Sequence, residues 1–449
     1  MGWIKRLAKL ALVIVLAGLL GVSAWLYAAP PELLRVASGY AAKIVCSNVF
    51  IAGRDAQQVL ADDVQAPGHP LLKYMKLDVD TAQRTVTTSL PVGIAKRVAL
   101  YRPGYGCTLL GDDGAMPPAV PVAEVPSKTP EAGALWPEGE AVTLNGRLQA
   151  VIEQEELAGP NARAIVVVKD GRIVAERYGT GFNAAMPLLG WSMTKTVNAM
   201  VIGALLGEGR LGLDDSQLLP AWQNDSRSSI RLRDLLAMED GLTFNEDYGT
   251  VDDVTRMLFL EPDMARYGAS LPADQPPAKV FNYSTGTAIL LSRIWMNRMG
   301  DNAAAISFPR QAIFAPLGMK TATLELDASN TFVGGSYMYA SARDWARLGL
   351  MLAQGGMWEG TRLLPEGFVE DMGVPNATSD GRYSKLQTWL PKNMKLDLPA
   401  GSFQLKGHDG QSMTVIPAKG IVILRMGLTP SKLRYTPQKL IQAVMNELG

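Results

Sequence analysis

The chain contains few of the residues that bind metals. Its 449 residues include two cysteines and two histidines, His69 and His408, and no His-Glu-x-x-His motif or Cys-rich spacing is present. Zinc enzymes use such clusters as ligands. A metallohydrolase is therefore not expected, and we predict neither a metal nor another cofactor.

An excess of charge of one sign is missing as well. Lysine plus arginine number 43 and aspartate plus glutamate also number 43. Strong basic fields attract nucleic acids, so this balance predicts no nucleic-acid partner. Aromatic residues make up 7% of the chain, and we find no internal repeat. The length and composition indicate a globular protein of two or three domains.

One long apolar run lies near the N-terminus, at residues 10–29, and Lys5, Arg6 and Lys9 precede it. Its length matches a bilayer core, and the positive end is expected in the cytoplasm. We favour a membrane anchor with the rest of the chain on the periplasmic or extracellular side. The small residues Val22, Ser23 and Ala24 also suit signal-peptide cleavage, after which the protein would be secreted.

Both cysteines fall in a small N-terminal segment, residues 31–125. In an oxidising compartment Cys46 and Cys107 are expected to form a disulfide that stabilises this segment, the alternative being two separate buried thiols. Residues 111–140 are rich in Pro, Ala, Gly and acidic side chains, which resist regular structure. We place a linker at residues 126–134 and a second domain at residues 135–449. The small segment is a spacer, a docking surface or a lid.

The second domain begins and ends with strand patterns. Residues 163–169 and 172–178 flank Asp170-Gly171, a type I′ turn pair, and residues 412–416 and 421–426 form a similar hairpin. The middle, roughly residues 194–369, is mostly helical by periodicity, with one apolar stripe at Val197, Val201, Ala204 and Leu205. The pattern predicts an α+β fold, an α/β sandwich in which helices flank an antiparallel sheet, plus an all-helical lobe.

Ser192 and Lys195 are three residues apart at the start of a helical segment. Residues at i and i+3 lie on one helix face, so the lysine amine can reach the serine hydroxyl. A lysine in a partly desolvated cleft loses proton affinity and can act as a base. The spacing alone is weak evidence, because Ser-x-x-Lys is a short motif.

Two further motifs contain groups that could take part in catalysis. Tyr283 precedes an apolar helix at residues 288–296, and a nearby lysine ammonium is expected to favour its anion for proton relay. The alternative is a buried tyrosine with a satisfied hydroxyl. The small-residue turn at residues 407–411 leads into a hairpin strand, which we expect at the sheet edge, and could aim a backbone N–H at an oxyanion. His408 within it is alternatively a surface residue.

Together these motifs resemble the serine β-lactamase and penicillin-binding-protein superfamily, in its class C-like branch, which includes carboxylesterases and 6-aminohexanoate-dimer hydrolases. The resemblance covers residues 148–426. The matching segments, in family order, are WSMTKT from Trp191, GRLGLDD from Gly209, IRLRDLLAMEDGL from Ile230, YSTG from Tyr283 and GGSYMYASARDWARLG from Gly334.

The resemblance implies roles for these residues. Ser192 would be the acylated nucleophile, with Lys195 as base and Tyr283 sharing the proton transfers. The N–H groups of Ser192 and Gln411 would form the oxyanion hole. The protein would then be a serine hydrolase acting on a small-molecule ester or amide in a β-lactamase/transpeptidase-like fold.

Two departures from the β-lactamase pattern shape the expected substrate. Thr285 stands where asparagine is typical, and His408-Asp409-Gly410 stands where Lys-Thr-Gly is typical. The departures favour an esterase or amidase over a β-lactamase or D-Ala peptidase. A non-catalytic membrane-tethered penicillin-binding or sensor protein is a further alternative. An α/β-hydrolase is not expected, because Ser192 lacks the second glycine of a nucleophile elbow. Specificity is expected from the loops at residues 243–277 and 374–402.

Overall fold

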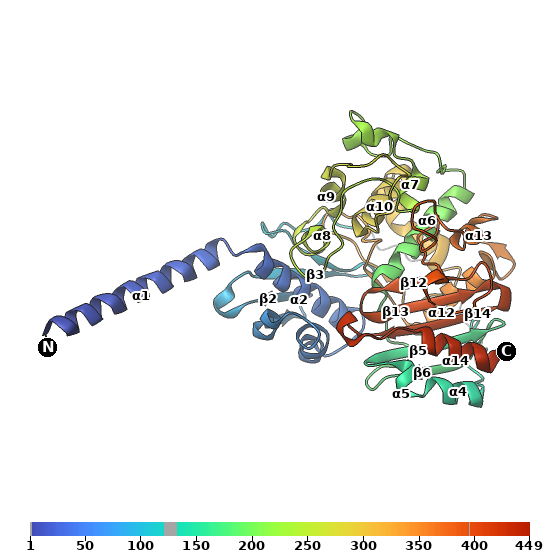
Figure 1. Ribbon diagram of the computed structural model, residues 1–449, viewed down its shortest axis with the longest axis horizontal. Coiled ribbons are helices and arrows are strands. Elements are labelled where there is room, and N and C mark those ends of the chain that lie inside the picture. Colours follow the sequence, from blue (N-terminus) through green and yellow to red (C-terminus); the bar gives the residue numbers. More distant parts are fainter. Residues whose placement is uncertain (1, 121–132, 395) are drawn as a thin grey trace.

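An exposed apolar helix precedes the body of the protein. The computed structural model describes residues 2–120, 133–394 and 396–449, and its helix α1 (Gly2–Ala28) projects away from the body (Figure 1). Within that part of the chain, α1 is the one helix whose length and composition suit a membrane span. An N-terminal helix with these properties fits both an anchor and a signal sequence.

A small sheet and one long helix form the N-terminal segment. Helix α2 (Glu32–Phe50) packs against three of the four strands, and α3 (Ala56–Val59) follows it. A disulfide joins Cys46 of α2 to Cys107 of β4, as the sequence predicts, with the two Cα atoms 6.0 Å apart. The strands are antiparallel neighbours in chain order: β1 (Lys76–Asp80), β2 (Thr85–Ser89), β3 (Arg97–Arg102) and β4 (Gly106–Leu109).

The N-terminal segment shares a hydrophobic core with the rest of the chain. Val45 of α2 lies in the same buried cluster as Leu258 of α8 (Asp253–Leu260). Beside this cluster, buried Lys43 pairs with buried Glu325. The described part of this segment is therefore packed against the rest of the protein through contacts between α2 and α8 (Figure 1).

The structure describes little of the predicted boundary between the domains. Of the predicted linker, residues 126–134, only the last two belong to the described residues. The division into residues 31–125 and 135–449 therefore stays a prediction.

Five antiparallel strands form the central sheet, in the order β12-β13-β14-β5-β6. Both predicted hairpins are present, and Asp170 and Gly171 have the positive φ angles, 48° and 82°, that a type I′ turn requires. The strand bounds are β5 (Ala162–Lys169), β6 (Arg172–Tyr178), β12 (Phe403–Gly407), β13 (Gln411–Ile416) and β14 (Ile421–Gly427).

Helices cover both faces of this sheet. Because side chains alternate along a strand, Val166 packs toward α12 (Ala342–Ala353) while Ile165 joins the cluster of α4 (Gly146–Ile152) and α14 (Gln438–Leu448). This arrangement is the expected α+β fold.

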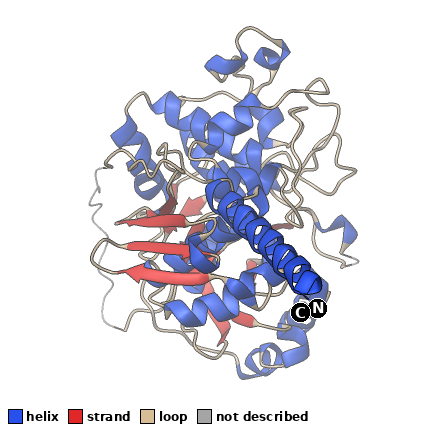
Figure 2. Ribbon diagram, turned by 90° about the vertical axis from the view of Figure 1, so that its left-hand side faces the viewer, coloured by secondary structure: helices blue, strands red, loops and turns tan. Residues whose placement is uncertain are grey.

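The other helices form a lobe on one side of the sheet (Figure 2). Its central helix, α6, is buried from Thr194 to Leu205, so the polar face opposite the predicted apolar stripe is buried too. The helices of the lobe are α6 (Thr194–Gly207), α7 (Leu232–Leu236), α9 (Met264–Ser270), α10 (Thr285–Met299) and α11 (Asn302–Pro309).

The predicted helical middle also contains short strands. Strands of two or three residues are too short for a period-of-two pattern to reveal them. Strands β7, β9 and β8 form a three-stranded sheet in that order, and β10 pairs with β11. The remaining elements are α5 (Glu155–Ala158), β7 (Leu188–Leu189), β8 (Thr323–Leu324), β9 (Met338–Ala340), β10 (Met357–Trp358), β11 (Thr361–Arg362) and α13 (Phe368–Met372).

Candidate active site

Ser192 lies in a tight turn between β7 and α6. The turn is a single 3₁₀ segment (Trp191–Met193), and Trp191 has a positive φ of 48°, which is strained for a bulky residue. The Gly190 amide donates to the Met338 carbonyl at 2.9 Å. A Cβ at position 190 would meet the Trp345 ring at 2.3 Å. Packing on both sides therefore holds the serine in place.

Lys195 is in the first turn of α6 and reaches Ser192 as the spacing predicts. Its Nζ lies 3.0 Å from Ser192 Oγ, 2.8 Å from Thr285 Oγ1 and 3.0 Å from the Gly335 carbonyl oxygen. The side chain is 1% exposed, and burial lowers the pKa of Lys195 to about 8. A neutral lysine amine beside a serine hydroxyl can accept its proton.

Glu246 is a part of this site that the sequence did not reveal. Its carboxylate accepts hydrogen bonds from the Thr285 amide, at 2.7 Å, and from the Thr285 hydroxyl. It lies 4.0 Å from Lys195 Nζ, and its charge raises the pKa of that lysine against the larger effect of burial. The residue belongs to a loop expected to set specificity, but no motif distinguishes it from Asp247 beside it.

Tyr283 lies at the start of α10, where Ser284 caps the helix by accepting from the Thr287 amide at 2.9 Å. The Tyr283 ring is 4.8 Å from Lys195 Nζ, and the Ser192 side chain acts on its hydroxyl, lowering the pKa of Tyr283. Burial and the nearby charge of Glu246 raise the pKa of Tyr283. The expectation that the lysine favours a tyrosine anion is therefore wrong, because desolvation dominates and keeps the phenol protonated.

Aromatic side chains surround Tyr283 on one side of Ser192. The Tyr283 ring lies 5.0 Å from Trp389 and 5.8 Å from Tyr383. Lys406 Nζ lies 5.6 Å from the centre of the Trp389 ring, and burial lowers the pKa of this lysine. The structure therefore places a lysine side chain beside Trp389, on strand β12 rather than at position 408.

Strand β12 forms the sheet edge beside the site. A Cβ at Gly407 would meet the Gly190 carbonyl oxygen at 2.2 Å, so β12 and the Ser192 turn are in close contact. Gln404 exchanges backbone hydrogen bonds of 2.8 and 2.9 Å with Trp389, on the side away from β13. Along an extended strand, the backbone N–H groups of successive residues point to opposite sides, and Gly407 is extended. The N–H of His408, four residues after Gln404, therefore points to the same outer side as the N–H of Gln404, where Trp389 lies.

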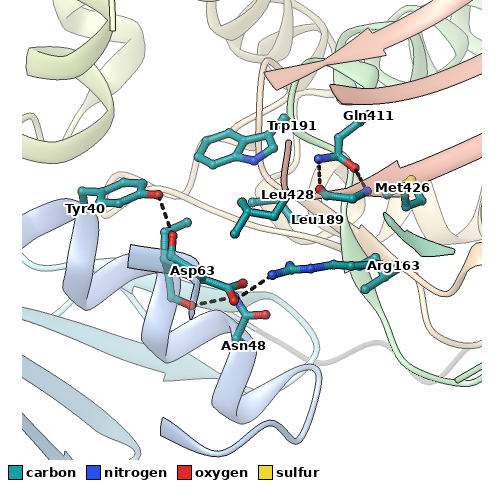
Figure 3. A pocket seen from close by; sticks show the side chains of 12 residues that line it. Tyr40, Asn48, Asp63, Arg163, Leu189, Trp191, Gln411, Met426 and Leu428 are labelled. Atoms are coloured by element: carbon teal, nitrogen blue, oxygen red, sulfur yellow. Dashed lines mark hydrogen bonds and ion pairs between the residues drawn. The ribbon is translucent and has the colours of Figure 1, made fainter. Parts of the chain in front are cut away.

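Gln411 does not occupy the position that the sequence suggested. It begins β13 and is paired with Gly407, so its backbone lies behind β12 as seen from the cleft. Its side-chain amide bonds to the Gly427 backbone at 2.5 and 2.8 Å, and Figure 3 shows it directed toward the end of β14. Residues His408–Gly410 form the turn between the two strands. This pairing argues against Gln411 as the oxyanion donor, and the role of His408 as a replacement for a lysine stays a prediction.

The His408 imidazole packs between two aromatic rings. Its ring centre lies 4.8 Å from that of Tyr248, in a stacked arrangement, and 5.5 Å from that of Trp191. Its Nε2 is 3.4 Å from Asp409 Oδ1. The structure therefore places this side chain beside the Ser192 turn, in contact with the rings of Trp191 and Tyr248.

Known proteins resemble this chain over the region just described. A family model described as Beta-lactamase matches residues 154–431, more than half of the chain. The 6-aminohexanoate-dimer hydrolase of Paenarthrobacter ureafaciens is 24% identical over 297 residues, which is 60% of this chain and 72% of that protein.

Solved structures share the fold. EstCE1, described as a hydrolase with promiscuous acyltransferase activity, has a TM-score of 0.55 at 16% identity, covering 68% of this chain and 98% of that chain. A penicillin-binding protein homolog from Caulobacter crescentus has a TM-score of 0.51 at 16% identity, covering 65% and 94%.

Proposed function

The chain belongs to the β-lactamase family of serine hydrolases, and from this premise we propose that it hydrolyses an ester or amide through an acyl-enzyme at Ser192. The observation that carries the proposal is the buried Lys195 Nζ, 3.0 Å from Ser192 Oγ, with its pKa lowered to about 8. With this pKa, about a tenth of the lysine is neutral at pH 7 and about half at pH 8, and the neutral amine can take the serine proton as the oxygen attacks the carbonyl carbon.

The developing oxyanion is stabilised by two backbone donors. The Ser192 N–H is one, and the outward-pointing His408 N–H at the end of β12 is the other. Preorganised donors of this kind are each worth roughly a hundredfold or more in rate. This assignment replaces Gln411 by His408 while keeping the role.

Tyr283 delivers a proton to the leaving group. Its phenol stays protonated because burial and the charge of Glu246 raise its pKa, and the Ser192 side chain beside it lowers that pKa by less. When the tetrahedral intermediate collapses, this proton passes to the departing oxygen or nitrogen. The proton that Lys195 took from Ser192 then passes to the Tyr283 oxygen, which restores both groups. In deacylation the neutral Lys195 amine takes a proton from the attacking water and returns it to the Ser192 oxygen as the acyl bond breaks.

An ester or amide without a β-lactam ring suits the site better than an antibiotic. The Thr285 hydroxyl is committed to Lys195 and Glu246, so no side-chain amide is offered at this position. The 6-aminohexanoate-dimer hydrolase and EstCE1 are hydrolases that resemble the chain, which supports the same substrate class. We further propose that α1 anchors the catalytic body outside the cytoplasm.

Turnover assays with a serine variant test the proposed function. Full-length protein is incubated with p-nitrophenyl acetate and with a chromogenic cephalosporin, and the Ser192→Ala variant is compared with the surface control Ser229→Ala. We expect ester hydrolysis that only Ser192→Ala abolishes, together with fluorophosphonate labelling of Ser192. Labelling without turnover would favour a sensor, and faster cephalosporin hydrolysis would favour a β-lactamase.

A further inference from the structure

A cavity of about 450 Å³ lies where the N-terminal segment meets the Ser192 turn. Its volume falls within the range of roughly 300–1,000 Å³ typical of small-molecule sites. Helix α2 provides one wall, and the residues around the nucleophile provide the other. The apolar and aromatic side chains that define it are Leu33, Val36, Ala37, Trp191, Tyr248 and Phe259.

The cavity shares a wall with the site of catalysis. Trp191 directly precedes Ser192, and His408 packs between Trp191 and Tyr248. Tyr248 also lines the cavity, and the Thr285 side chain, the neighbour of Lys195, lowers the pKa of Tyr248 against the larger effect of burial. A group bound in this cavity therefore contacts Trp191, the residue directly before the nucleophile.

The lining suits a hydrocarbon chain better than a polar group. The charged residues at its edge already have partners, since Lys432 donates to the Pro67 carbonyl at 3.2 Å and Asp409 faces His408 at 3.4 Å. The apolar side chains of α2 are left to contact the occupant. Burial of a hydrocarbon chain against such a wall is favourable for each methylene removed from water.

Two ion pairs join the N-terminal side of the cavity to the rest of the protein. Lys43 of α2 pairs with Glu325, and Asp63, after α3, pairs with Arg163 of β5 at 2.7 Å (Figure 3). The disulfide between Cys46 and Cys107 holds α2 on its own small sheet.

The aromatic residues around Tyr283 are separate from those that line the cavity. In the proposed function Tyr283 protonates the leaving group, and neither Tyr283 nor its neighbours Tyr383 and Trp389 line the cavity. The cavity is thus available to the acyl part of the substrate. At its mouth, Leu33 is 40% exposed, five positions after the last residue of α1.

We propose that this cavity binds the acyl chain of the substrate, which makes the protein a hydrolase of medium-chain aliphatic esters or amides. The inference rests on the proposed function, because it assumes that the carbonyl reacts at Ser192. It gives the N-terminal segment a role in specificity: the segment forms half of the acyl-chain site.

A chain-length series tests the proposal. Full-length protein in phosphatidylcholine nanodiscs is assayed with p-nitrophenyl acetate, butyrate, hexanoate and octanoate. We expect kcat/KM to rise about threefold to fourfold for each added methylene until the cavity is filled. Monooctanoylglycerol, offered free in solution or in phosphatidylcholine vesicles, shows whether the acyl chain comes from solution or from a bilayer.

A variant that fills the cavity distinguishes binding of the acyl chain from the hydrolysis reaction itself. Ala37→Phe is expected to abolish the gain for octanoate and leave acetate hydrolysis within twofold of wild type. Ala82→Phe, the same change on the exposed turn after β1, is the control and should keep the full gain. Acetate turnover with no chain-length dependence, or equal loss for acetate and octanoate in Ala37→Phe, would overturn the acyl-chain site alone. If the wild-type protein neither hydrolysed acetate nor became labelled at Ser192, the proposed function would be overturned and this inference with it.

Discussion

The Glu246 carboxylate accepts two hydrogen bonds from Thr285, one from its amide and one from its hydroxyl. From this position its negative charge raises the pKa of Lys195, 4.0 Å away. Glu246→Gln removes the charge and nearly preserves the shape. The pKa of Lys195 is then expected to fall below about 8. In a pH profile of kcat/KM for p-nitrophenyl acetate, the acidic limb should move to lower pH.

The neighbouring Asp247 provides the control for this charge. Its carboxylate accepts from the Gly249 amide at 2.7 Å and has no bond to Thr285, so Asp247→Asn should leave the acidic limb within about 0.2 pH units of wild type at physiological salt. An unchanged limb in Glu246→Gln, or a shift to higher pH, would show that Glu246 does not act on Lys195 in this way.

Tyr283→Phe removes the proton donor and leaves Lys195 in place. General acid catalysis is worth roughly 10²–10⁴-fold, so kcat for an amide or alkyl ester should fall by about that factor. Esters with a good leaving group, such as p-nitrophenolate, should lose much less, because their departure needs no proton. Steady-state kinetics on a matched pair of substrates measures this difference. Equal losses on both substrates would argue against the acid role.

Gly407→Ala tests the contact between β12 and the nucleophile turn. The added Cβ would meet the Gly190 carbonyl oxygen at 2.2 Å, so the strand and the turn must separate. We expect a loss of at least about tenfold in kcat/KM with a stability loss of about 1–3 kcal/mol. Gly146→Ala is the control, because its Cβ would meet nothing within 4 Å. If Gly407→Ala had the kinetics of the wild type, the close contact between Gly407 and Gly190 would not be what positions the oxyanion donor.

Lys43 and Glu325 form a buried ion pair that joins α2 to the catalytic lobe. Glu325 also accepts from Ser47 Oγ at 2.8 Å and from the Cys107 amide at 2.6 Å. Lys43→Met leaves this buried carboxylate without its cation, which should cost about 3–5 kcal/mol in the free energy of unfolding. Urea denaturation measures the loss. The double variant with Glu325→Gln should recover part of it, and a single variant as stable as wild type would contradict the account.

Local patterns were sufficient to predict several parts of the molecule. The hairpin at Asp170-Gly171 and the proximity of Ser192 to Lys195 both follow from residues a few positions apart, where sequence spacing fixes geometry. Both are present in the structure. The pairing of Cys46 with Cys107 was predictable for a different reason, since the chain offers one combination of two cysteines.

Features that depend on strand order were not predictable. The sequence shows the β13–β14 hairpin clearly, but β12 is five residues long and ends in Lys406-Gly407. Without β12, Gln411 was assigned to the sheet edge, and the N–H of His408 was not considered as an oxyanion donor. Glu246 was missed for a similar reason, because its role arises from contact with Thr285, which is 39 residues away in the chain.

The pH dependence of Ser192 acylation is the most direct test of the central claim. Fluorophosphonate labelling is followed by mass spectrometry in wild type, Lys195→Ala and Lys195→Arg. The account predicts that the wild-type rate rises with pH through about 8, the pKa of Lys195. Both variants should lose the reaction, because alanine has no base and arginine stays charged. Labelling of Ser192 at the wild-type rate in either variant, or a wild-type rate that does not change between pH 6 and 9, would contradict the account.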